Sequence, residues 1–173
     1  MAITKQTEFG LTLDILRELM ISSSGAIVSH QVGKALLHKV PLYGRTGMAE
    51  MRKIMTGLMD ELRDRLAAEY VVVDLSSPPP QTSLPKRLRD EAAFLAAIIT
   101  YCPAYAQDDT EHARLIEEGM WWARIAQDKL QEALLYQISA WRNIDKDQLR
   151  EALADYRRGV EAAVEGGYSA MVL

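Results

Sequence analysis

The stretch from Thr110 to Arg142 carries apolar side chains every three or four positions and contains no proline. This spacing matches the 3.6-residue period of an α-helix, in which such side chains share one face. We therefore predict one unbroken helix of about 45–50 Å, at 1.5 Å per residue, against which the other segments pack. Its stripe consists of Ile116, Met120, Ala123, Ala126, Leu130, Leu134, Ile138 and Trp141.

Further helical patterns lie on both sides of this stretch. The patterns that precede it predict helices over residues 7–21, 29–39, 48–70 and 85–102. A last helix is predicted from about Asp145 to Gly166, and the short turn before it requires an antiparallel arrangement with the long helix. The run 70–75 is rich in β-branched residues and fits either a short strand or the end of a helix. The predicted fold is an all-α bundle of five or six helices, with the long central helix at about 110–142 paired to the C-terminal helix.

Three consecutive prolines, Pro78 to Pro80, mark the best candidate for a domain boundary. Such a run continues neither a helix nor a strand and favours a stiff, extended connector. We therefore divide the chain into an N-terminal helical subdomain (1–75), a proline-rich connector (76–83) and a C-terminal antiparallel helical subdomain (84–173). The length of 173 residues is also compatible with one compact domain.

Composition and charge limit where the protein works and what it binds. Cys102 is the only cysteine, so no intramolecular disulfide can form, and a reducing, cytoplasmic location is expected. No run of about 18 apolar residues is present, so we expect a soluble protein without membrane contact. The formal net charge of −4 supplies no overall attraction to phosphate, and nucleic-acid binding would need a local cationic face.

Residues suited to catalysis or metal binding are scarce. The three histidines are His30, His38 and His112, and only Asp109-Thr110-Glu111-His112 approaches the Glu-x-x-His pattern of a di-metal helical bundle. In that sequence the acids are better explained as favourable charges at a helix N-terminus. Cys102 lies on the apolar face of its predicted helix, where a thiol is inert. We expect no enzyme activity, no metal and no cofactor.

A predicted partner-binding site rests on two groups of large, adaptable side chains. Trp121 and Trp122 are adjacent, so they point about 100° apart on a helix. Either one of them sits at an exposed boundary suited to a partner, or the helix has a wide apolar face that other helices contact on two sides. Met51, Met55 and Met59 lie on the helix over 48–70, where methionines suit either a forgiving core or a docking face. We predict an interaction or regulatory protein, such as an adaptor, an inhibitor or an immunity-type protein, whose partner is another protein or a second copy.

The alternative function is a helix-turn-helix regulator of transcription. Between Ser24 and Gly57 basic residues outnumber acidic ones, and the expected order there is helix, turn, helix. The C-terminal helices would then serve dimerisation or sensing. The connection from Val40 to Gly47 is, however, longer than the usual three- or four-residue turn. The expected DNA contacts are Lys34, Lys39, Arg45, Thr46, Arg52 and Lys53.

Overall fold

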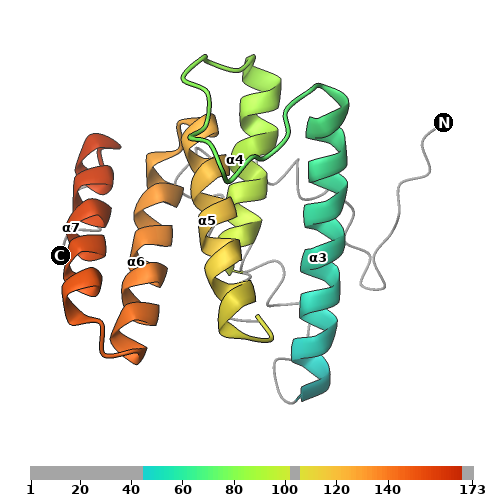
Figure 1. Ribbon diagram of the computed structural model, residues 1–173. Coiled ribbons are helices and arrows are strands. Elements are labelled where there is room, and N and C mark those ends of the chain that lie inside the picture. The colour runs from blue at the N-terminus through green and yellow to red at the C-terminus, as the bar shows by residue number, and fades with distance from the viewer. Residues whose placement is uncertain (1–44, 102–105, 169–173) are drawn as a thin grey trace.

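A computed structural model describes residues 45–101 and 106–168 of the chain, without the side chains of residues 45–51, 54 and 101. Within these two ranges the protein is all-α, with five helices and no strand, as predicted (Figure 1). The helices predicted at 7–21 and 29–39 lie outside the described residues. The helices are α3 (Arg45–Ala68), α4 (Lys86–Tyr101), α5 (Asp109–Ala126), α6 (Lys129–Asp145) and α7 (Leu149–Glu165).

The prediction of one unbroken helix from Thr110 to Arg142 is wrong. Gln127 adopts a left-handed backbone conformation with φ of 58°, and its N–H donates to carbonyls of the last turn of α5. Asp128 then caps α6, because its side chain accepts from the backbone N–H of Gln131 at 3.1 Å. The chain reverses at these two residues, so α6 returns alongside α5 (Figure 1). Because the helix is interrupted, α5 and α6 can bury apolar surface against each other, which one straight helix could not do.

One core joins α3, α4 and α5 and includes Leu135 of α6. The helix α4 lies at its centre, where Phe94, Leu95 and Ile99 are at most 1% exposed. Gly119 of α5 permits a close approach to α4, since a Cβ at this position would lie 2.7 Å from Cγ2 of Ile99. The core is continuous across the proline-rich connector, because α3 precedes this connector and α4 follows it.

The predicted antiparallel pairing of the C-terminal helix is present between α6 and α7, which a three-residue connection joins (Figure 1). Small residues form much of the side of α7 that faces α6. Gly159 allows close contact there, since an added Cβ would lie 3.3 Å from the carbonyl oxygen of Ala133. The buried residues of α7 are Ala152, Asp155, Gly159, Ala162 and Ala163.

The β-branched run after α3 forms a helix end and not a strand. Tyr70 has a left-handed φ of 63°, and the N–H of Val71 donates to the carbonyl of Leu66 at 2.9 Å. Val71 folds back into the core, whereas Val72 is 62% exposed. None of the helices that the structure describes combines the length and the apolar composition that crossing a bilayer requires.

Candidate interaction surface

The structure buries four of the five residues predicted to bind a partner. The exposed fractions are 6% for Trp121, 1% for Trp122, 3% for Met55 and 5% for Met59. The two indole rings contact each other edge to face, with centroids 4.9 Å apart. The side chain of Met51 is outside the description. These tryptophans and methionines therefore pack the core and offer no exposed docking face in this fold.

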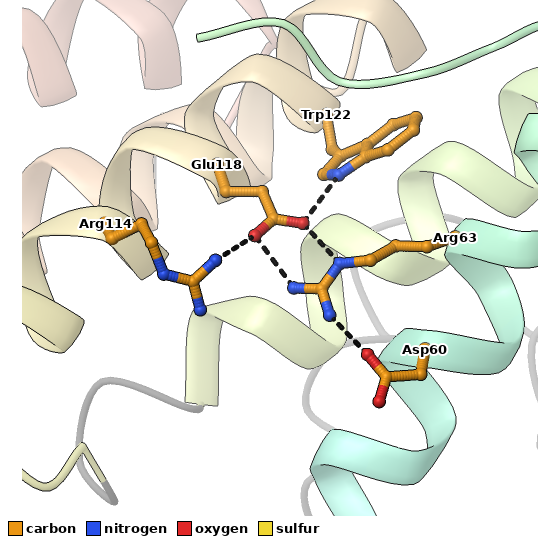
Figure 2. A network of polar contacts seen from close by, with 5 residues as sticks. All are labelled: Asp60, Arg63, Arg114, Glu118 and Trp122. Carbon is orange, nitrogen blue, oxygen red and sulfur yellow. Dashed lines mark hydrogen bonds and ion pairs between the residues drawn. The ribbon is translucent and has the colours of Figure 1, made fainter.

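A polar network beside Trp122 connects α3 to α5 (Figure 2). Glu118 is only 2% exposed, and its carboxylate accepts two hydrogen bonds from Arg63, from Nε at 2.6 Å and from Nη2 at 2.8 Å. Arg114 donates to the same carboxylate at 3.4 Å, and the indole N–H of Trp122 donates at 3.3 Å. Asp60 in turn accepts from Nη1 of Arg63 at 2.8 Å. The buried charge is thus compensated, and the network fixes two helices that are distant in sequence.

A second ion pair between α3 and α5 uses Arg52, one of the expected DNA contacts. Nη2 of Arg52 donates to both carboxylate oxygens of Glu111, at 2.8 and 3.0 Å. The backbone N–H of Gln107 also donates to Glu111, and this bond together with Arg52 lowers the pKa of the Glu111 carboxyl. Arg52 therefore contributes to contact between helices.

The six expected DNA contacts are not brought together on one described surface. Arg45 and Thr46 open α3, but their side chains are outside the description, and Lys34 and Lys39 lie in the part of the chain that is not described. Lys53 is exposed on α3. Among these six residues, Arg52 and Lys53 are the two whose side chains the structure describes.

The acids and the histidine at the start of α5 form contacts within the fold. Asp109 accepts from Nε and Nη2 of Arg142, at 2.8 and 2.9 Å, and from Lys146, and these bonds hold the pKa of its carboxyl far below the usual range. Burial lowers the pKa of His112, and the charges of Arg142 and Lys146 lower it further. In residues 45–101 and 106–168 no group of three or more potential metal ligands occurs.

We expect His112 to make the protein less stable as the pH falls. Because its pKa is lower in the folded state than the ordinary value near 6.5, the unfolded chain binds a proton first. The stabilising contribution is present above that ordinary value and is lost as the pH falls from it through the lower pKa of the folded state. Urea unfolding at pH 7.5, 6.5 and 5.5 should show a smaller loss for His112→Gln than for the natural chain. Equal losses in the two proteins would contradict this expectation.

A groove of about 370 Å³ lies between the loop 75–79 and helices α5 to α7. Asp155 of α7 lines it, and its carboxylate accepts from Ser139 at 2.7 Å, from Asn143 at 3.0 Å and from Arg158 at 3.2 Å. These three donors already satisfy the most buried acid of the groove. The arrangement joins α6 to α7 and leaves this carboxylate little capacity to bind a ligand.

Among the helices that the structure describes, α7 has the most exposed apolar surface. Four large aliphatic side chains lie 4, 7 and 4 residues apart along this helix, on a face centred roughly 120° around the helix axis from its small buried residues. We call this surface the α7 outer face. It consists of Leu149 (65% exposed), Leu153 (52%), Val160 (42%) and Val164 (60%). Trp141 (52%) and Ile144 (42%) add exposed apolar area near the end of α6 that adjoins the start of α7.

The sequence contains a signal that separates this surface from the buried residues of α7. Leu149, Leu153 and Val160 lie together on a helical wheel, and Ala152 and Ala163 form an adjacent row of small residues. Reading both rows as one stripe predicts that all of them are buried. The size difference between the rows indicates instead that one packs closely and the other remains outside.

Comparisons with protein-family models, with curated proteins and with solved structures each found no match.

Proposed function

We propose that this protein is a non-catalytic, cytoplasmic interaction or regulatory protein that binds its partner through the α7 outer face. The proposal rests on one observation, which is that small side chains of α7 are buried while its large aliphatic side chains are exposed. Alanine and glycine dominate its buried side, while leucine and valine are exposed on the other. An exposed row of large apolar side chains on a helix is typical of a docking site for another protein.

The energetic gain from covering this face supports the proposal. Full burial of a leucine or valine side chain contributes about 1.5–3 kcal/mol, and these four are roughly half exposed. Covering them would therefore contribute on the order of 4 kcal/mol before the entropy cost of association. Removing the same side chains should cost the isolated fold less than removing a core side chain, because each is already at least 42% exposed to water.

The proposal keeps the predicted class of function and changes the surface that carries it. Trp121, Trp122, Met55 and Met59 pack in the core and expose at most 6% of their surface, so they offer a partner little area. The α7 outer face is available without any rearrangement of the described helices. It also lies at the edge of the bundle, where α7 is the last helix of the row (Figure 1).

Site-specific photocrosslinking in the native cell tests this proposal. A benzoylphenylalanine at position 153 should give an adduct of discrete mass, because Leu153 lies on the α7 outer face. Position 151 is the matched control, since Glu151 is exposed on the same helix but points about 160° away. If positions 149, 153, 160 and 164 all give no adduct, the proposed function is wrong.

A further inference from the structure

We infer that the partner of the α7 outer face is a second copy of this chain, with the two α7 helices packed antiparallel. The inference rests on the proposed function, because it names the occupant of the same surface. It is drawn from the order of the side chains along α7 and from the charges beside them. Both features are self-complementary when one helix is reversed against the other.

The apolar side chains of α7 have the spacing of a coiled-coil seam. Leu149, Leu153, Tyr156 and Val160 follow one another at intervals of 4, 3 and 4 residues, and Tyr156 is half-buried at the middle. Reversing a second helix about the centre places Leu149 opposite Val164, and Leu153 opposite Val160. Each aliphatic side chain then meets another aliphatic side chain, as a two-fold symmetric interface requires.

Charges on one flank of the seam favour the antiparallel direction. Arg150 and Glu161 are both exposed, and they lie within about 20° of each other on the helical wheel. They are 11 residues apart, or about 16 Å at 1.5 Å per residue, so they cannot pair within one helix. Neither has an ion-pair partner among the residues that the structure describes.

In the antiparallel pair, Glu161 of each copy lies two positions, or about 3 Å along the axis, from the residue directly opposite Arg150 of the other copy. The long arginine side chain spans this offset, so two identical ion pairs form. A parallel pair would align like charges at each end of the seam and would form neither bond. Arg157 lies on the same flank near the two-fold axis, where the two copies of its guanidinium repel each other. We therefore expect Arg157→Ala to strengthen self-association.

A single pair of helices buries less surface than the roughly 800 Å² per partner of a standard interface. We therefore expect a dissociation constant in the micromolar range. The full chain should change from monomer to dimer in sedimentation velocity runs over concentrations from about 1 to 300 µM. Leu153→Glu should abolish the dimer without unfolding the protein, because Leu153 is already 52% exposed to water in the monomer.

A charge swap gives the decisive test. Arg150→Glu and Glu161→Arg, made singly, should each weaken the dimer on the order of ten-fold, because each change converts two attractive pairs into repulsive ones. The double variant should return to within about three-fold of the natural chain, because it restores both pairs with reversed polarity. Circular dichroism on each variant confirms that the helices are intact. Because the two residues are too far apart to pair within a chain, such a rescue can arise only between antiparallel copies.

Two results would overturn the inference. One is a chain that stays monomeric over the whole concentration range, and the other is a charge swap without rescue. The crosslinking experiment then separates this failure from failure of the proposed function. An adduct at position 153 with a mass other than twice that of the chain identifies a different partner and leaves the proposed function standing. If the chain stays monomeric and no crosslinked adduct forms, both the inference and the proposed function are wrong.

Discussion

Replacing Trp122 by alanine is expected to lower the free energy of unfolding by about 3–5 kcal/mol. The ring is 1% exposed and packs edge to face against Trp121 in the core shared by α3, α4 and α5. Its indole N–H also donates to Glu118 at 3.3 Å, so the substitution removes a donor from a buried carboxylate. Urea unfolding followed by circular dichroism measures the change.

The chain supplies its own control in a third tryptophan. Trp141 is 52% exposed, so Trp141→Ala should change the free energy of unfolding by less than about 1 kcal/mol. Trp122→Phe provides a measurable intermediate if the alanine variant does not fold, because it keeps an aromatic ring but loses the N–H. Equal costs for Trp122→Ala and Trp141→Ala would show that Trp122 is not a core residue.

Replacing Arg63 by methionine is expected to cost about 3–5 kcal/mol, because it leaves the Glu118 carboxylate buried without its main partner. Glu118 is 2% exposed, and of its two arginines Arg63 is the closer, at 2.6 Å compared with 3.4 Å for Arg114. Methionine matches much of the volume of the arginine stem. The expected cost therefore arises mainly from the uncompensated charge and not from a cavity.

A double variant separates the charge from the packing. Arg63→Met combined with Glu118→Gln removes both charges and keeps an amide oxygen that can accept from Trp122. This double variant should be more stable than Arg63→Met alone. Lys86→Met is the control for an exposed ion pair, since Lys86 and Asp90 are 80% and 56% exposed and their loss should not be measurable. If the double variant is no more stable than Arg63→Met, the buried charge is not the cause.

The candidate surface could be predicted only in part. The residues of the α7 outer face belong to a helix that the sequence predicts, and their spacing is visible in it. Periodicity does not show which row of that helix is buried, because both rows are apolar, and only the difference in side-chain size between the rows points to the answer. Likewise, Trp121 and Trp122 point in different directions on one helix. Both are buried only because α5 is surrounded by neighbours on more than one side.

The sequence by itself determined the helical class and most helix positions. It also contains a capping pattern, in which Asp108 stands three residues before Glu111, and the side chain of Asp108 accepts from the N–H of Glu111 at 2.8 Å. These features depend on residues three or four positions apart, so local patterns specify them. Asp128 and Gln131 repeat this capping pattern, but an unbroken apolar period runs through them, and only the tertiary structure showed that the chain reverses there. The tertiary structure also decided which helices Arg63 and Glu118 connect and which face of α7 remains exposed. Those outcomes depend on contacts between segments far apart in the chain, as the 55 residues between Arg63 and Glu118 illustrate. Packing of whole helices selects them, and local patterns such as the cap at Asp128 or the side-chain sizes on α7 only favour the outcome.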